Sequence, residues 1–202
     1  MNFLFTCGGT AGHINPALAV AGILRDRMPD CGILFVGANG KMETDLVPRA
    51  GYDIVTIEVT NIHRSLKPSE IAYNFRSLHN ARQATKDARK IIEDFQPDVA
   101  IGTGGYVSGP VVRAAAKKGI KTAIHEQNAF PGVTNKLLAK DVDVVFAASA
   151  AAVEKLGAPE KTLVVGNPVR PEILNRDRAA ARAAVHAGDR TVILSFGGSY
   201  GA

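Results

Sequence analysis

The sequence has few cysteines: Cys7 and Cys31 are the only two among 202 residues. Two thiols exclude a disulfide framework and the common four-ligand zinc patterns. We expect Cys7 to end one strand and Cys31 to begin its parallel neighbour, which places them at opposite ends of a sheet, too far apart to bridge. Cys7 could act as a catalytic thiol, but a small buried apolar residue is the better interpretation.

Long hydrophobic runs are also missing. No stretch approaches the length of a membrane-spanning helix, and the N-terminus lacks the basic start, apolar core and cleavage site of a signal peptide. Hydrophobic residues at 46% and charged residues at 21% are ordinary for a globular protein. We therefore expect a cytoplasmic protein with one large domain, or one domain and part of another.

Several ligand motifs are absent as well. GxGxxG would need glycine where Cys7 stands, and GILFVGANG offers no acidic residue for a ribose. The Walker pattern GxxxxGK[ST] and a second histidine at HExxH spacing are missing too. These absences argue against a nicotinamide dehydrogenase, a P-loop NTPase and a zinc site of the HExxH type.

The net charge of +5 is concentrated in one block. Residues 61–90 carry seven basic and two acidic side chains, an excess of five that equals the charge of the whole chain. Such a block indicates an anionic partner, either a membrane surface or a nucleic acid. Because Tyr73 and Phe75 are its only rings, it lacks the interleaved aromatics that stack on bases, and we expect no nucleic acid as partner.

Short apolar runs alternate with helix-length spacers along the chain. Continuous apolar strands joined by crossovers are typical of the α/β class with a doubly wound, Rossmann-like parallel sheet. The runs predict strands at 2–7, 32–37, 53–59, 98–103, 121–126, 142–147, 162–167 and 191–196. The spacers predict helices at 15–28, 69–95, 107–118 and 133–140.

The first of these helices is expected to have Asn15 as its N-cap and Pro16 at its first position. Pro168 and Pro171 indicate a boundary, so we expect one domain over 1–166 and the start of a second over 167–202. The sequence ends directly after the glycine turn SFGGSYGA, where a helix should begin. We therefore expect the front part of a longer protein.

Three predicted strands run into glycine-rich turns, FTCGGTAGH, IGTGGYVSGP and SFGGSYGA. At the carboxyl ends of parallel strands, such turns favour a phosphate or diphosphate ligand over simple corners. His13 lies beside the first turn. It is either a residue that hydrogen-bonds at the helix start or a general base for a hydroxyl, and its position alone leaves both open.

Two polar motifs follow. HEQN at 125–128 either hydrogen-bonds a hydroxyl-rich ligand or stabilises its own loop. Asp141 and Asp143 match the metal-binding DxD of many sugar transferases, but they lead straight into a strand, so we interpret them as its solvated start and expect no metal.

The predicted helix 69–95 has two apolar faces at 100° per residue. One stripe should face the sheet: Ala81, Ala84, Ala88, Ile91, Ile92 and Phe95. The other face has Ile71, Phe75 and Leu78 in line with Arg82. An apolar tip followed by cations is typical of a contact with an anionic membrane surface, although a neighbouring loop could cover the tip instead.

Six motifs in fixed order make the chain recognisable from Phe3 to Ala202. Together they closely resemble the MurG family of peptidoglycan glycosyltransferases. The motifs are GGTAGHINPALAVA, METDLVP, IGTGGYVSGP, HEQNAFPGVTNKLLA, VVGNPVR and FGGSYGA. The resemblance implies a GT-B fold whose first half binds the acceptor, and transfer of N-acetylglucosamine from UDP to the C4 hydroxyl of undecaprenyl-diphosphate-linked N-acetylmuramoyl-pentapeptide (lipid I) at the cytoplasmic side of the membrane.

The same resemblance implies roles for single residues and no cofactor. His13 would be the base. The acceptor's diphosphate would lie against Gly8, Gly9, Thr10, Gly12, Gly104, Gly105, Tyr106 and Gly109. The donor UDP-N-acetylglucosamine would contact Thr10, Gly12, Asn128, Arg170 and Ser199. Ala11 and Tyr200 depart from the family pattern, at positions where glycine and glutamine are common.

Alternatives remain beside an enzyme half, which we expect to be inactive alone. The chain could be a non-catalytic, membrane-docked acceptor subunit of a split transferase. It could also belong to another GT-B transferase acting on lipid or small-molecule acceptors, which HEQN and GGYVSG disfavour.

Overall fold

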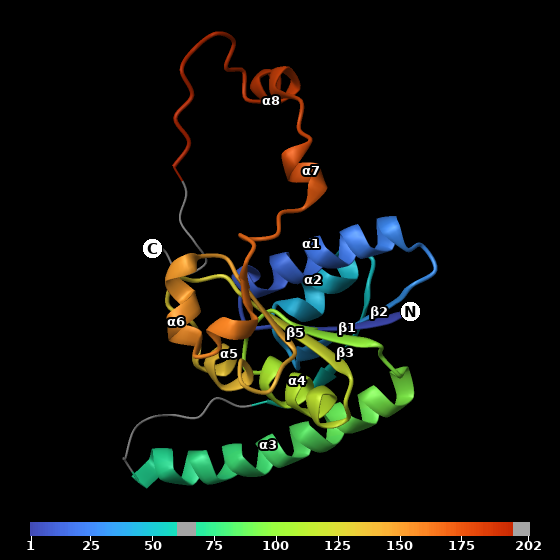
Figure 1. The fold of residues 1–202 in the computed structure, drawn as a ribbon. Coiled ribbons are helices and arrows are strands. Elements are labelled where there is room, and N and C mark those ends of the chain that lie inside the picture. The colour runs from blue at the N-terminus through green and yellow to red at the C-terminus, as the bar shows by residue number, and fades with distance from the viewer. Residues whose placement is uncertain (60–67, 196–202) are drawn as a thin grey trace.

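The computed structural model of the 202-residue chain describes residues 1–59 and 68–195, with side chains in the long helix described from 82 onward. Seven strands form one parallel sheet in the order β3-β2-β1-β4-β5-β6-β7 (Figure 1). The strands are β1 Asn2–Thr6, β2 Gly32–Ala38, β3 Asp53–Ile57, β4 Val99–Gly102, β5 Lys121–Glu126, β6 Val144–Ala147 and β7 Thr162–Val164. The predicted Rossmann-like α/β class is confirmed.

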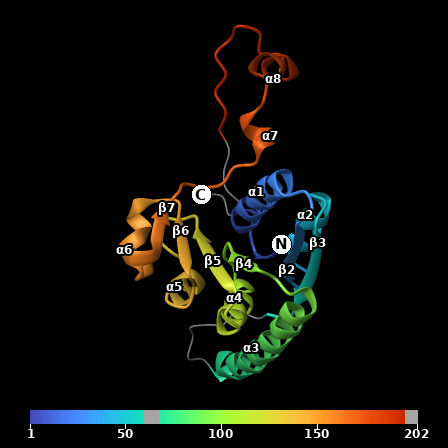
Figure 2. The ribbon, with the colours of Figure 1, turned by 45° about the vertical axis from the view of Figure 1, so that its right-hand side comes forward.

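Helices connect successive strands and cover both faces of the sheet. The α-helices are α1 Ala11–Arg27, α2 Glu43–Arg49, α3 Pro68–Phe95, α4 Ser108–Lys117, α5 Val133–Leu138, α6 Val153–Leu156, α7 Pro171–Leu174 and α8 Arg178–Ala184, and the short 3-10 turns are η1 Ala150–Ala152 and η2 Pro159–Lys161. Figure 2 shows α1 and α2 on one face, with α3 and α4 on the other. Each face has its own apolar core, as expected when a parallel sheet is covered on both sides.

The long helix α3 packs on the sheet through the predicted stripe. Ala84, Ala88 and Ile92 are buried, and Ile91 and Phe95 pack against the same core. Ala81 lies outside the described side chains. Small residues at every fourth position let this helix approach the sheet closely, and the stripe is confirmed from Ala84 onward.

The predicted start of α1 is wrong. The helix begins at Ala11, directly after the first glycine turn, and Thr10 is its N-cap. Asn15 and Pro16 lie inside the helix. Pro16 lies beyond the first turn and lacks the amide that would bond to the Gly12 carbonyl, so the helix loses one hydrogen bond there. His13 is therefore in the first helical turn, with its backbone amide on the Thr10 carbonyl at 3.0 Å.

The predicted strand at 191–196 is also wrong over the residues described. Residues 191–195 form no strand, and Val192, Ile193 and Leu194 are exposed. Strand propensity needs a hydrogen-bonded neighbour, and the sheet ends at β7. The segment that carries α7 and α8 extends away from the sheet (Figures 1 and 2).

Candidate functional site

The two described glycine turns meet at the carboxyl edge of the sheet, where the strand order reverses between β1 and β4. A Cβ on Gly105 would lie 2.4 Å from the Gly8 carbonyl oxygen, so only glycine allows this approach. Gly105 also has a φ of +87°, which favours glycine. The Thr103 amide donates to the Thr6 carbonyl at 3.0 Å and fixes one turn against the other.

A cavity of about 220 Å³ opens beside these turns. It lies at the switch point of the sheet, the place where open α/β folds bind ligands. Its lining residues come from the loops after β1, β2, β3 and β4: Gly8, Gly9, Thr10, His13, Ala38, Lys41, Val59, Gly105, Tyr106 and Val107. The structure thus brings His13 and both described turns together around one hollow.

His13 is held in the tautomer that a general base requires. Its Nδ1 lies 2.9 Å from the Gly8 carbonyl oxygen. Because a carbonyl only accepts hydrogen bonds, Nδ1 carries the proton and Nε2 keeps its lone pair. The ring lies against Gly104, where a Cβ would come within 2.7 Å of the His13 Cδ2. Thr103 Oγ1 donates to the His13 carbonyl at 2.6 Å, which ties the helix to the second turn.

Glu43 organises the first turn, a role that sequence reasoning missed. Its side chain is buried and accepts hydrogen bonds from the amides of Gly9 at 3.0 Å and Ala38 at 2.9 Å. A Cβ on Gly8 would collide with this carboxylate. The only signal was an acidic residue five positions after the second strand, in METDLVP. Its partner Gly9 is 34 residues away, so the contact could not be read from spacing.

The start of α1 has backbone amides that are free to donate hydrogen bonds to a ligand. The Gly9 amide is satisfied by Glu43. The amides of His13 and Ile14 bond to the Thr10 carbonyl. Within the described chain no partner is recorded for the amides of Ala11 and Gly12. These are the free amides expected in the first turn of a 17-residue helix, where the dipole favours an anion.

The HEQN loop is a second rigid part of the same edge. Glu126 is buried and accepts four hydrogen bonds, two from Asn128, one from Gly132 and one from Asn135. Gln127 Nε2 donates to the Thr103 carbonyl at 2.7 Å and thereby connects this loop to the second glycine turn. Stabilisation of the loop therefore accounts for Glu126 and Gln127, while Asn128 is exposed at the rim.

His125 is buried beneath this loop and is neutral. Its Nε2 donates to the Gly166 carbonyl at 3.0 Å, and its Nδ1 accepts from Gln127 Nε2 at 3.0 Å. Burial lowers the pKa of His125, because the charged imidazolium is poorly solvated there. His125 thus joins β5 to the segment after β7 and has no base function at the cavity.

The two cysteines are free thiols, as expected. Cys7 follows β1 and is fully buried. Burial, and to a smaller extent the Glu43 carboxylate, raise the pKa of the Cys7 thiol. A thiol that stays protonated is a poor nucleophile, so Cys7 is an apolar core residue.

The other residues singled out from the sequence lie at or beyond the rim. Tyr106 is 59% exposed at the mouth of the cavity. Gly109 is in the first turn of α4, and a Cβ there would make ordinary contact with Thr134. Arg170 caps α7 and lies 3.5 Å from Glu172. Arg82 is exposed. Four further residues lie outside the described side chains: Ile71, Phe75, Leu78 and Ser199.

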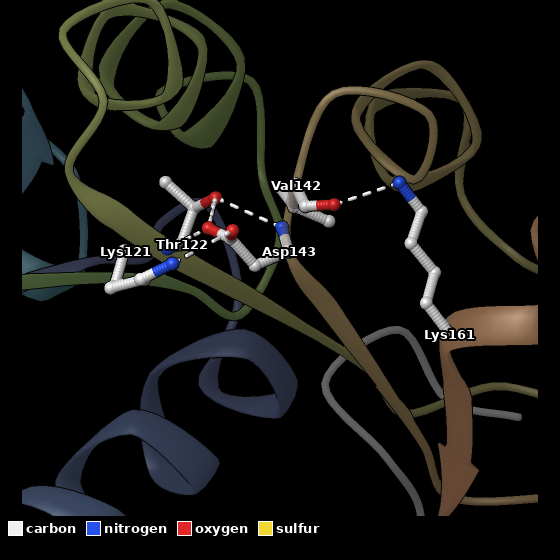
Figure 3. Close-up of polar contacts among 5 residues, drawn as sticks. All are labelled: Lys121, Thr122, Val142, Asp143 and Lys161. Atoms are coloured by element: carbon white, nitrogen blue, oxygen red, sulfur yellow. Dashed lines mark hydrogen bonds and ion pairs between the residues drawn. The ribbon is translucent and has the colours of Figure 1, made fainter.

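Asp141 and Asp143 lie at the opposite, amino edge of the sheet. Asp143 accepts from the Thr122 amide and hydroxyl (Figure 3). Asp141 pairs with Arg113 at 2.9 Å. Within the described residues, no group of three metal-binding side chains is found. Their interpretation as the solvated start of a strand agrees with these contacts. Across the same part of the chain, no helix combines the length and apolar character needed to span a bilayer.

A doubly wound parallel sheet with a histidine and two glycine turns around a switch-point cavity defines a Rossmann-like domain with a candidate ligand site. The sequence profile of the glycosyltransferase family 28 N-terminal domain matches residues 3–147. The chain belongs to this family.

Curated relatives agree with this assignment. The chain is 44% identical over 203 residues to the UDP-N-acetylglucosamine--N-acetylmuramyl-(pentapeptide) pyrophosphoryl-undecaprenol N-acetylglucosamine transferase of Desulforamulus reducens, and 43% identical over 203 residues to that of Caldanaerobacter subterraneus. All of the chain is covered, but only 54% and 55% of the two relatives, so it spans about half of their length.

A solved structure of a MurG protein has a similar fold. The crystal structure of Acinetobacter baumannii MurG superposes with a TM-score of 0.65 at 28% identity, over 89% of this chain and 47% of that one. The resemblance inferred from the six motifs is confirmed. The chain corresponds to the N-terminal half of these proteins.

Proposed function

We propose that this chain is the acceptor-binding half of a transferase that moves N-acetylglucosamine from UDP-N-acetylglucosamine to the C4 hydroxyl of undecaprenyl-diphosphate-linked N-acetylmuramoyl-pentapeptide. One observation carries the proposal. The Gly8 carbonyl fixes the proton on Nδ1 of His13 beside the cavity, so that Nε2 can accept a proton. The whole-chain identity to transferases of this name supports the choice of substrates.

In this mechanism His13 Nε2 removes the proton from the C4 hydroxyl while the oxygen attacks the anomeric carbon of the donor sugar. The bond from that carbon to UDP breaks, UDP leaves with the electron pair, and His13 becomes an imidazolium. Attack from the face opposite UDP converts an α-linked donor into a β1,4-linked product. The Gly8 carbonyl then accepts from the imidazolium and helps to stabilise it.

The diphosphate of the acceptor would lie at the start of α1. The amides of Ala11 and Gly12 and the helix dipole provide donors and positive potential there. Tyr106, at the mouth of the cavity, would contact the acceptor sugar. Asn128 and Arg170 would contact the donor, together with Ser199. Residues 1–166 would form the acceptor domain and 167–202 the start of the donor domain.

A contact with an anionic membrane surface would deliver the lipid-linked acceptor from the cytoplasmic side. Arg82, Lys86, Arg89 and Lys90 are exposed on α3 and support this proposal. The apolar residues of this proposed membrane contact would be Ile71, Phe75 and Leu78, which are assigned from the sequence pattern alone. Cations beside an apolar helix tip bind the headgroup layer of such membranes.

A transfer assay on the full-length protein tests the proposal. The assay uses UDP-N-acetylglucosamine and a short-chain acceptor analogue, with His13→Ala compared with wild type. Loss of a general base is expected to lower kcat about 10²- to 10⁴-fold with a small change in the acceptor KM. His186→Ala, which removes an exposed histidine far from the cavity, is the control and should keep full activity.

Two results would contradict the proposal in different ways. Absence of transfer by the wild-type protein would exclude the function itself. Full activity of the His13→Ala variant would leave the function standing and remove His13 as the base. We expect the 202-residue chain alone to bind the acceptor without transferring sugar, because its relatives are almost twice as long.

A further inference from the structure

One charged side chain in the cavity has no role in the mechanism above. Among the described residues that line the hollow, Lys41 is the only one with a permanent positive charge. It lies in the loop between β2 and α2 and lines the same cavity as Thr10 and His13 at the start of α1. We propose that Lys41 binds the diphosphate of the acceptor from this second side; the inference rests on the proposed function and names a further residue for its substrate.

The loop holds the Lys41 backbone in a defined place. Gly40 has a φ of +64°, which turns the chain back toward the cavity. The Asn39 amide donates to the Ile57 carbonyl at 3.2 Å. The Thr44 hydroxyl and amide donate to the Lys41 carbonyl at 2.6 and 3.0 Å. Hydrogen bonds thus hold the backbone carbonyl of Lys41, and the residue lines the cavity.

Glu43 makes a cation at this place necessary for an anionic ligand. Its buried carboxylate takes the Gly9 amide, which a phosphate would otherwise use. It also places a negative charge next to the turn, within the same low-dielectric wall. A diphosphate entering the cavity meets that repulsion together with the two free amides of α1. The ammonium of Lys41, two residues from Glu43 in sequence, offsets it.

Lys41 is available for such a ligand. No carboxylate within the described chain forms an ion pair with it, although neighbouring Arg49 pairs with Asp45. Its side chain is exposed at the cavity wall. Lys67 and Arg64, in the segment after Val59, lie outside the described residues. A flexible ammonium is suited to phosphate as a point charge, and hydrogen bonds from charged donors are stronger than neutral ones.

Binding to the 202-residue chain tests the inference by calorimetry. Two acceptor analogues are compared, one with the diphosphate and one in which an uncharged spacer of equal length replaces it. Lys41→Met is expected to weaken binding of the diphosphate analogue about tenfold and to leave the uncharged analogue unchanged. Lys41→Arg should restore binding to within about twofold, since it keeps the charge. Lys117→Met, the same change at the far end of α4, should have no effect.

UDP also carries a diphosphate, so a competition experiment tests whether Lys41 binds the diphosphate of the acceptor or that of UDP. Excess UDP is expected not to displace the acceptor analogue. Equal binding of the diphosphate analogue by wild type and Lys41→Met would overturn the inference and leave the proposed function intact. An equal loss of affinity for both analogues in Lys41→Met would also overturn the inference. So would displacement of the diphosphate analogue by UDP in wild type that is absent in Lys41→Met. Failure of wild type to bind either analogue would instead overturn the proposed acceptor function, and this inference with it.

Discussion

The two edges of the sheet use acidic residues in different ways. At the carboxyl edge, Glu43 and Glu126 are buried and their oxygens accept hydrogen bonds from loop amides and side-chain amides. At the amino edge, Asp141 and Asp143 are exposed, and Asp141 pairs with Arg113. Asp143 contacts Lys121 and Thr122 at the surface (Figure 3). Lys161 there donates to the Val142 carbonyl at 2.7 Å.

This difference separates the edge that forms the site from the edge that supports the fold. A buried carboxylate whose oxygens are all hydrogen-bonded fixes a loop in one shape, because each lost bond leaves a buried donor unsatisfied. A surface ion pair contributes little and tolerates change. Rigid loops hold a histidine and a bound ligand in a fixed position relative to each other. Substitutions at the carboxyl edge should therefore cost more stability than substitutions at the amino edge.

The largest effect is expected for Glu126→Ala at the carboxyl edge. This change removes the acceptor of four hydrogen bonds and should lower the free energy of unfolding by about 3–5 kcal/mol. Urea unfolding of the 202-residue chain measures it. Glu126→Gln, which keeps one acceptor oxygen, should cost less, and Glu154→Ala on the surface should cost under about 0.5 kcal/mol. A loss below 1 kcal/mol for Glu126→Ala would remove the distinction between the edges.

The next effect is expected where the two glycine turns touch. Gly105→Ala should cost about 3 kcal/mol, because the new Cβ would meet the Gly8 carbonyl at 2.4 Å and the backbone has a φ of +87°. Gly157→Ala is the matched control: its φ is +73°, with nothing within 4 Å of the new Cβ. That variant should cost only about 1 kcal/mol.

The difference between these glycine variants isolates the contact between the turns. It should also appear in activity, because the Gly8 carbonyl sets the tautomer of His13. Equal losses of stability for the two variants would mean that the turns can separate without cost. In that case the cavity would not depend on their contact.

The fold could be predicted from local patterns because its strands are continuously apolar and helix-length spacers separate them. GILFVG and KTAIHE show no polar alternation, which is typical of strands covered on both faces. The two wrong predictions, the start of α1 and the last strand, arose where a local sequence signal is compatible with two structures. Asn15 and Pro16 match a helix cap, yet α1 had already begun at Ala11. Residues 191–195 have strand propensity but no neighbouring strand to pair with.

The site could be predicted in part, and the limit has a physical cause. The glycine turns and His13 follow from sequence, because several glycine-rich turns after predicted parallel strands indicate the carboxyl edge of the sheet and the histidine is adjacent to the first of them. Glu43 could not be found in this way, since its partner Gly9 lies in the turn after β1, 34 residues away in sequence. Lys41 was one lysine among many until the loop after β2 was placed beside the loop after β1. Contacts across such loops depend on tertiary structure.

The smallest effect is expected at the amino edge, for Asp143→Asn. Hydrogen bonds from the Thr122 amide and hydroxyl hold the pKa of Asp143 below its usual value, and Lys121 contributes less. A depressed pKa in the folded state stabilises the protein above the unfolded pKa, which is about 3.9 for aspartate. This stabilisation is lost as the pH falls through the folded pKa. Because the side chain is 45% exposed, the variant should lose less than about 1 kcal/mol at pH 7.

The pH dependence provides the sharper measurement for this residue. The difference in unfolding free energy between wild type and Asp143→Asn should shrink as the pH falls below about 4, because Asp143 then takes up a proton in the unfolded chain and, at lower pH, in the folded protein as well. Asp53→Asn at the exposed start of β3 is the control, and no such hydrogen bond is recorded for Asp53 within the described chain. A loss at pH 7 as large as that of Glu126→Ala would show that exposed acids at the amino edge fix structure as strongly as buried ones. Rigidity would then not distinguish the edge that holds the cavity.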